Sequence, residues 1–115
     1  MPTEKRTRVE IFFPLRSDTL DYQIVAQFTA EEFAYSRGGS TLTTPFAGLY
    51  TSATRVDIVE DSIRILFCDL DANLDNRNEY DDLVLYLEKL KRGLIKALQE
   101  EEIWIVFYPI SRVIS

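Results

Sequence analysis

Histidine is absent from this chain of 115 residues, and cysteine occurs once, as Cys68. Without histidine the chain cannot form Ser-His or Cys-His nucleophile pairs, and it lacks the commonest protein ligand for zinc, copper and non-haem iron. A single cysteine cannot form an internal disulfide, so we expect a reducing, cytoplasmic setting. No motif requires a cofactor or a metal, and we expect neither. Any catalysis would have to use carboxylates, tyrosine, lysine, arginine or a borrowed cofactor.

Long apolar runs and an excess of positive charge are also missing. No run approaches the roughly 20 apolar residues that cross a bilayer, and residues 1–6 lack the apolar stretch of a secretory signal. The net charge is −6; residues 1–55 carry six basic and six acidic side chains, whereas residues 56–115 carry seven and thirteen. Such a surface repels a phosphate backbone. We therefore expect neither a membrane partner nor a nucleic-acid partner.

Hydrophobic periodicity predicts four strands and two helices. In order, the predicted elements are a strand over 8–15, a helix from 17 or 18 to 36, strands over 41–52 and 62–68, a helix over 80–99 and a strand over 103–108. This β-α-β-β-α-β order is typical of the ferredoxin-like fold, an α+β class with an antiparallel four-stranded sheet and two helices on one face. We expect a single domain over 8–113, preceded by a flexible N-terminal tail over 1–7.

Apolar residues at helical spacing predict which face of each helix meets the sheet. In the first helix these residues are Leu20, Ile24, Val25, Phe28 and Tyr35. In the second they are Leu83, Leu87, Leu90, Leu94 and Leu98.

Glycine and proline residues indicate where predicted elements end and which strands lie at the sheet edges. Gly38 and Gly39 follow the first predicted helix and precede a strand, which is the reverse of the strand-glycine-helix order of a phosphate-binding loop. We therefore interpret them as a helix cap. Pro45 falls within the second predicted strand and Pro109 follows the fourth, and a missing N–H is tolerated at a sheet edge. The ferredoxin-like order places these two strands at the edges.

The last predicted strand is apolar on both faces, although two helices can cover only one face of the sheet. The residues expected on the second face are Phe12, Leu66, Cys68, Trp104, Val106 and Tyr108. A monomer would expose several hundred Å² of apolar surface there. The simplest remedy is sheet-to-sheet packing of two copies with twofold symmetry, as in dimeric α+β barrels. The alternative is that residues 110–115 fold back over this surface.

An acidic segment has the spacing of a calcium loop at first sight. Asp71, Asn73 and Asp75 stand at the first, third and fifth positions, and Asp82 stands at the twelfth. However, Asn76 replaces the turn glycine, Asp82 replaces the bidentate glutamate, and a strand precedes the segment. A polar loop that caps the second helix explains the same residues, so we predict no metal site.

Polar and aromatic residues of the predicted sheet are the candidate ligand-binding residues. Thr41 and Thr43 share one face of a strand, where a small ligand could hydrogen-bond, with Arg37 and Tyr50 nearby in the sequence. A second set that could place an enolate between aromatic walls comprises Tyr50, Arg64, Trp104 and Tyr108.

One pattern in the chain resembles a known group. It consists of Gly38-Gly39-x-Thr41, then Gly48-Leu49-Tyr50, then Glu60-Asp61 before an apolar strand, then a long leucine helix and a final Ile-Trp-Ile-Val strand. The pattern covers about residues 8–113 and is similar to a loose group of small ferredoxin-like α+β proteins. Tyr50 stands where tryptophan is frequent in that group. The group is largely uncharacterised, so the resemblance implies a fold rather than an activity.

Two functions fit these observations. The first is a small cytoplasmic homo-oligomer that binds a metabolite or a protein partner, or regulates one, without intrinsic catalysis. The second is a cofactor-free enzyme of the dimeric α+β barrel type that holds a small apolar substrate between sheet and helices. A sizeable pocket lined by the second candidate set would favour the enzyme.

Overall fold

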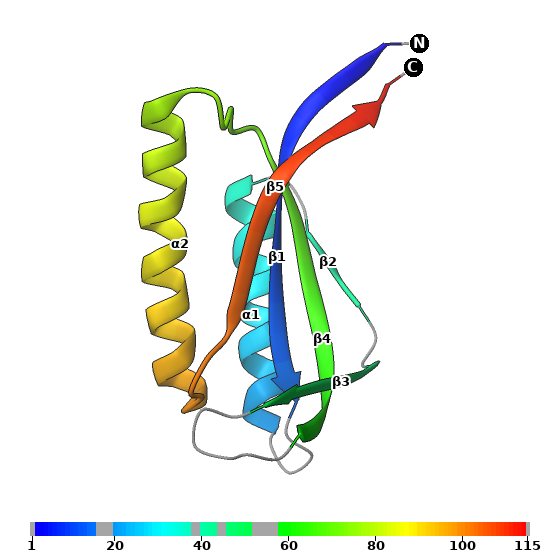
Figure 1. Ribbon diagram of the computed structural model, residues 1–115, viewed down its shortest axis with the longest axis vertical. Helices are drawn as coiled ribbons and strands as arrows, with labels where there is room; N and C mark the ends of the chain where they lie inside the picture. The colour runs from blue at the N-terminus through cyan, green and yellow to red at the C-terminus, as the bar shows by residue number, and fades with distance from the viewer. Residues whose placement is uncertain (1, 16–19, 38–39, 44–45, 52–57, 115) are drawn as a thin grey trace.

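The computed structural model describes residues 2–15, 20–37, 40–43, 46–51 and 58–114, and among these the side chains of 2–13, 22–33, 40–43 and 63–114. Its elements, in chain order, are β1 (Thr3–Leu15), α1 (Leu20–Arg37), β2 (Thr41–Leu42), β3 (Phe46–Thr51), β4 (Ile58–Leu70), α2 (Arg77–Leu98) and β5 (Trp104–Val113) (Figure 1).

The sheet is antiparallel, with β1 and β4 at its centre. β5 pairs with β1 along one edge, and both β2 and β3 pair with β4 along the other. β2 and β3 together occupy the edge position predicted for a single strand over 41–52, and Pro45 between them lies outside the described residues. Both helices lie on one face of the sheet (Figure 1). The predicted ferredoxin-like α+β fold is confirmed.

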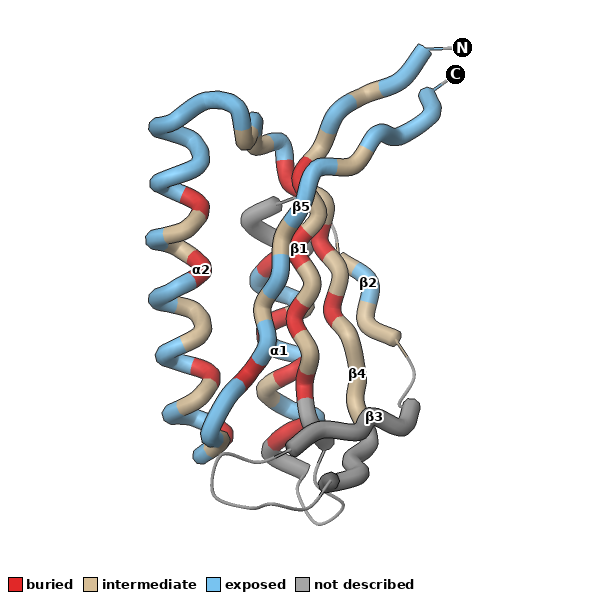
Figure 2. The backbone as a smooth tube through the Cα atoms, in the orientation of Figure 1, coloured by how far each residue is buried: buried red, intermediate tan, exposed pale blue. Residues whose placement is uncertain are grey.

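The core lies between the sheet and the two helices, and the buried positions of the central strands line it (Figure 2). In β1 the buried residues are Val9, Ile11 and Phe13, at the strand period of two. The register places Val9 opposite Cys68 and Ile11 opposite Leu66. Directly opposite residues point to the same face of a sheet, and both partners are buried.

Leu66 and Cys68 therefore belong to the helix-covered core, and their predicted place on the second face is wrong. Alternation within β4 divides its residues between two faces but does not show which face meets the helices. The register in which β4 pairs with β1 decides that.

Helix α2 matches its predicted stripe and begins three residues earlier than expected. Leu83, Leu87, Leu94 and Leu98 are buried, as its 3.6-residue spacing requires. Asn76 caps its first turn, because the side-chain oxygen accepts a hydrogen bond from the backbone N–H of Glu79 at 3.1 Å. At the other end Gln99 adopts the left-handed conformation, with φ of 55°.

Helix α1 buries a face that is only partly the predicted one: Val25 packs against the core as predicted, whereas Ile24 and Phe28 do not. The side chains that meet the core are Tyr22, Ala26, Thr29 and Phe33. Ile24 and Phe28, predicted to face the sheet, are 41% and 65% exposed. The predicted start of this helix at 17 or 18 and the predicted cap at Gly38 and Gly39 lie outside the described residues.

Among the described residues, neither helix combines the length and the apolar character that a bilayer crossing requires.

The two ends of the chain form a ribbon that projects beyond the helices (Figure 1). Thr3 lies opposite Val113 and Thr7 lies opposite Pro109. The Glu4 carboxylate accepts from Arg6 Nε at 2.6 Å and from Arg112 Nη2 at 2.5 Å, and these ion pairs support the ribbon.

Three expectations change as a result. Residues 3–7 are part of β1 and not a flexible tail, because they pair with the end of β5. Pro109 lies within the edge strand and does not end it. Residues 110–113 continue β5, so they do not fold back over the sheet.

A hydrogen bond joins the start of α1 to the end of α2. The buried Tyr22 hydroxyl lies 2.9 Å from the carbonyl oxygen of Leu98 and also contacts the Glu100 carboxylate. The Leu98 carbonyl belongs to the last turn of α2, where carbonyls lack partners within the helix.

We expect Tyr22→Phe to lower the free energy of unfolding by about 1–2 kcal/mol, because it leaves this carbonyl without its partner. Urea unfolding measures the change. The control is Tyr80→Phe, whose ring lies against Phe107 at the exposed side of α2, and we expect a change within about 0.5 kcal/mol. Equal losses in the two variants would contradict the proposed role of the Tyr22 hydroxyl.

Candidate functional site

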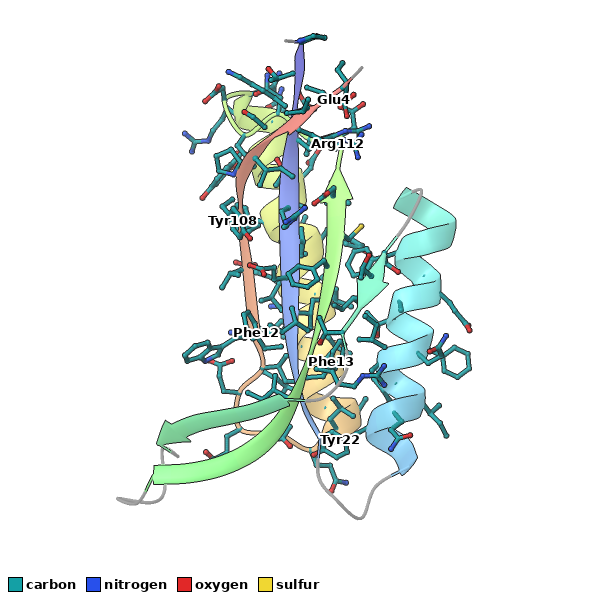
Figure 3. The ribbon with its side chains drawn as sticks, turned by 90° about the vertical axis from the view of Figure 1, so that its right-hand side faces the viewer. Glu4, Phe12, Phe13, Tyr22, Tyr108 and Arg112 are labelled. Carbon is teal, nitrogen blue, oxygen red and sulfur yellow. The ribbon has the colours of Figure 1, made fainter. Side chains whose placement is uncertain are left out.

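The face of the sheet that the helices leave uncovered, called here the open face, is the larger candidate surface. Phe12 and Tyr108 lie on it, on the opposite side of the sheet from Tyr22 (Figure 3). Its side chains form three cross-strand rows over β4, β1 and β5. These rows are Ile65–Phe12–Trp104, Phe67–Glu10–Val106 and Asp69–Arg8–Tyr108. The open face thus changes from apolar to charged along the strands.

Five residues make up the apolar patch of the open face: Phe12, Ile65, Phe67, Trp104 and Val106. Trp104 is 62% exposed. Its ring meets Phe12 edge to face, with centroids 6.2 Å apart and an interplanar angle of 74°. Edge-to-face contact brings the positive edge of one ring against the negative face of the other, which is favourable. Both rings therefore belong to one apolar surface that solvent reaches.

The charged end of the open face carries three acidic and three basic side chains. They are Glu4, Glu10 and Asp69, and Arg6, Arg8 and Arg112. Asp71, which follows β4, also interacts electrostatically with Arg6. The charged end therefore carries both signs close together.

The Arg8–Asp69 ion pair is the best-formed contact of the charged end. Arg8 Nε lies 2.8 Å from Asp69 Oδ1 and Arg8 Nη2 lies 3.1 Å from Oδ2, which is the bidentate geometry of a strong pair. The guanidinium also lies over the Phe67 ring, 5.7 Å from its centroid. Hydrogen bonding from Arg8 lowers the pKa of Asp69. A hydrogen bond to Glu10 raises the pKa of Tyr108.

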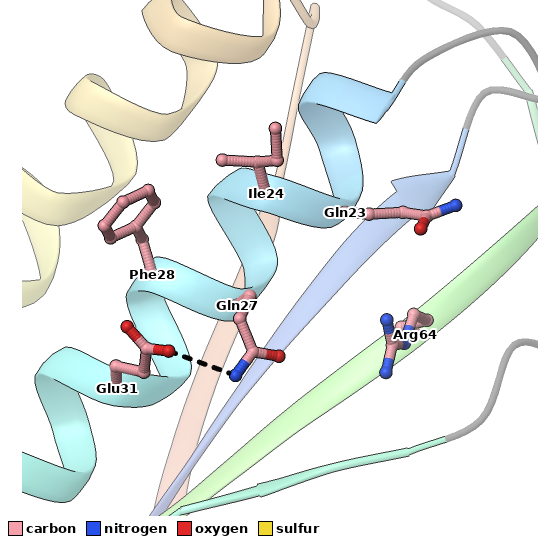
Figure 4. A pocket seen from close by; sticks show the side chains of 6 residues that line it. All are labelled: Gln23, Ile24, Gln27, Phe28, Glu31 and Arg64. Carbon is pink, nitrogen blue, oxygen red and sulfur yellow. Dashed lines mark hydrogen bonds between the residues drawn. The ribbon is translucent and has the colours of Figure 1, made fainter.

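A second candidate surface is a hollow of about 420 Å³ over α1 (Figure 4). Its lining residues are Gln23, Ile24, Gln27, Phe28, Glu31 and Arg64. Arg64 comes from β4 opposite Phe13, and so faces the helix side of the sheet. Its Nε donates to the carbonyl oxygen of Thr43 at 2.9 Å. We call this site the α1 hollow.

The structure divides the candidate ligand-binding residues between these two surfaces. Thr43 and Arg64 meet beside the α1 hollow. Trp104 and Tyr108 lie on the open face, and Thr41 lies opposite Phe67 at its edge. Arg64 thus shares no face with Trp104 and Tyr108. The side chains of Arg37 and Tyr50 lie outside the described residues.

Sequence reasoning missed the glutamines of the α1 hollow. Gln23, Gln27 and Glu31 recur every four residues along α1, which is a helical spacing. Their period was visible in the sequence, but a polar stripe on a helix is usually a solvated face. Only the position of Arg64 on β4 makes this stripe part of a hollow.

The acidic segment before α2 forms the loop that caps this helix. Asn73 Oδ1 accepts from the backbone N–H of Asp75 at 3.0 Å, and Asn76 caps α2 as described above. A second hollow of about 370 Å³ lies beside it, with Arg6, Asp71, Glu79 and Asp82 in its lining. Within the described part of the chain, no three acidic or sulfur side chains are arranged to hold a metal ion. The capping interpretation is confirmed for Asn76.

Comparison with known proteins adds evidence about the fold. No protein-family model matches this chain, and no curated protein does. Among solved structures, the divalent cation tolerance protein (Cut A1) from Thermus thermophilus is similar, with a TM-score of 0.56 and 16% identity over 93% of this chain and 84% of that one. The likeness is one of fold. It supports a small ferredoxin-like α+β protein, while the glycine pattern described above stays a prediction.

The lowered pKa of Asp69 gives a pH-dependent prediction. A carboxyl whose pKa is depressed in the folded state stabilises the fold above its unfolded pKa, and that stability is lost as the pH falls through the folded pKa. The Asp69 and Arg8 side chains are 22% and 36% exposed, so solvent screens part of the interaction. We expect Asp69→Asn to lower the free energy of unfolding by about 1 kcal/mol at about pH 7 and to have little effect at about pH 2.

Urea unfolding of both proteins at the two pH values measures this difference. The control is Asp81→Asn, since Asp81 pairs with Arg77 on the exposed side of α2 at 3.1 Å. This control should change stability by a few tenths of a kcal/mol at either pH. A loss in Asp69→Asn that is the same at both pH values would show that the ionised pair is not its cause.

Proposed function

We propose that this protein is a small homo-oligomeric binding or regulatory module without intrinsic catalysis, in which two copies pack through their open faces. The observation that carries the proposal is the apolar patch. Its aromatic and branched residues lie on a sheet face that no described element covers. Aromatic side chains are enriched at the centres of protein interfaces, and Trp104 has the size and exposure of such an anchor.

A second copy of the chain is the occupant that fits this face best. The charged end carries both signs, so acidic groups of one copy can meet basic groups of the other. A twofold axis lets each copy offer the same patch and the same charged end. A dimeric α+β barrel is one form of this packing. The alternative cover, a folded-back chain end, is removed because residues 110–113 continue β5.

The proposal of a module rather than an enzyme rests on how the polar residues are placed. The candidate enzyme residues Arg64, Trp104 and Tyr108 are divided between the two faces of the sheet. On the open face, Arg8 is paired with Asp69, and Tyr108 is hydrogen-bonded to Glu10. The cytoplasm is the setting we propose, from the single cysteine. The cation named for the structural neighbour is not carried over, because the likeness is one of fold.

We expect the protein to elute in size-exclusion chromatography with light scattering at twice its 13.4 kDa mass. Trp104→Glu should convert it to a 13.4 kDa species, because it places a charge within the apolar patch. The matched control is Leu85→Glu, which alters a 50% exposed leucine on α2, and this variant should keep the mass of the wild type. Circular dichroism checks that both variants are folded.

A wild-type mass of 13.4 kDa at micromolar concentration would overturn the proposal. So would a dimer that Trp104→Glu leaves intact or Leu85→Glu disrupts. A mass of three or more copies would overturn the twofold packing.

A further inference from the structure

The two edges of the sheet are built differently. On one side, β2 and β3 are short strands of two and six residues. On the other side, β5 is a continuous strand of ten residues, and no described strand pairs with its outer side (Figure 3). Natural proteins protect such an edge with charged side chains or proline. No residue from 103 to 111 is charged, and Pro109 interrupts the edge at one position only. β5 is therefore a long edge that is open to pairing.

The hydrogen bonds of the neighbouring strands show which backbone groups of β5 point outward. In an antiparallel sheet, alternate residues of a strand bond to opposite neighbours. The Thr43 N–H donates to the Ile65 carbonyl oxygen at 2.9 Å, so Ile65 turns its backbone away from β1. Phe12, which lies opposite Ile65, therefore turns its backbone toward Trp104 of β5. It follows that even-numbered residues of β5 bond to β1, whereas odd-numbered residues point outward.

Two further observations agree with this assignment. The Ile114 N–H donates to the Pro2 carbonyl oxygen at 3.2 Å, which continues the even-numbered set beyond the end of β5. Pro109 has no N–H and falls in the outward set, where its presence removes no bond to β1. The outward backbone N–H groups of β5 are those of Ile105, Phe107, Ser111 and Val113.

A second copy of the chain is a poor occupant of this edge. Antiparallel pairing of β5 with its own copy would bring two Pro109 residues to the pairing, whereas a different strand would meet only one. Each copy also carries a net charge of −6, and no charged side chain between 103 and 111 offsets the repulsion. A segment that is uncharged where it pairs and basic at its ends is attracted by the same net charge.

We propose that the β5 edge binds an extended, basic-flanked apolar segment of another protein by antiparallel strand addition. Carbonyl oxygens of the segment accept from the outward N–H groups of β5. Its side chains alternate between the two faces of the sheet, beside Val106 on one face and Phe107 on the other, and both neighbours are apolar. This segment is a partner for the proposed binding module. The pairing uses backbone groups of β5 and does not require the dimer.

The test is amide hydrogen exchange on the full chain, followed residue by residue by NMR spectroscopy. The probe is a capped synthetic peptide of alternating threonine and valine, flanked by lysines. In the free protein, we expect the even-numbered amides of 106–110 to exchange slowly and those of Ile105, Phe107 and Ser111 to exchange quickly. An excess of the probe should slow exchange in the second set at least about tenfold.

Each contrary outcome has a separate meaning. Slow exchange at Ile105, Phe107 and Ser111 before the probe is added would show that a second copy already occupies the edge, and would overturn the proposal. Exchange that the probe leaves unchanged would overturn it as well. A light-scattering mass of 13.4 kDa would overturn the proposed dimer alone, because strand addition to β5 does not depend on it.

Ser111 supplies a matched pair of variants. Ser111→Pro removes one outward N–H and keeps the bonds to β1, so it should weaken binding of the probe about fivefold or more. Ser111→Ala changes only an exposed side chain and should leave binding unchanged. Equal binding by the two variants would overturn the proposal. So would equal binding of a control peptide with proline in place of valine, because charge alone would then explain the binding.

Discussion

The pairing of β1 with β4 on one side and β5 on the other is the constraint on which the other features depend. The two registers determine which side chains of three strands share a face. They place Val9, Ile11 and Phe13 under the helices. They also gather the apolar patch and the charged end on the open face, and they turn Arg64 toward α1. A slip of one residue in either register would exchange these faces.

Much of the fold could be predicted from the sequence because it depends on local periodicity. The leucine spacing of α2 and the alternation in β5 are contained within single elements, and both were interpreted correctly. The order of elements then led to the ferredoxin-like fold. The faces of Leu66 and Cys68 depend on the phase between two strands, and so could not be derived from β4 alone. The ends of β1 and β5 were missed because their partners are about a hundred residues apart.

The candidate sites were predictable to the same extent. Trp104 and Tyr108 were placed on the second face because alternation within β5 suffices for that. The α1 hollow could not be predicted, because α1 has two apolar stripes and the sequence does not show which stripe meets the sheet. In the structure the stripe of Tyr22, Ala26 and Phe33 is buried, and the Tyr22 hydroxyl reaches the end of α2. Ile24 and Phe28 then lie on the exposed side of α1.

The terminal ribbon has a mechanical consequence. The two ends lie side by side (Figure 1), where the backbone N–H of Ile114 donates to the Pro2 carbonyl oxygen at 3.2 Å. A force that pulls the two ends apart acts across the β1–β5 ladder and opens its hydrogen bonds one after another, as in a zipper. Strands pulled from opposite ends would instead load all their bonds together. The β1–β5 pairing, although long, therefore offers little resistance to tension that pulls Thr3 and Val113 apart.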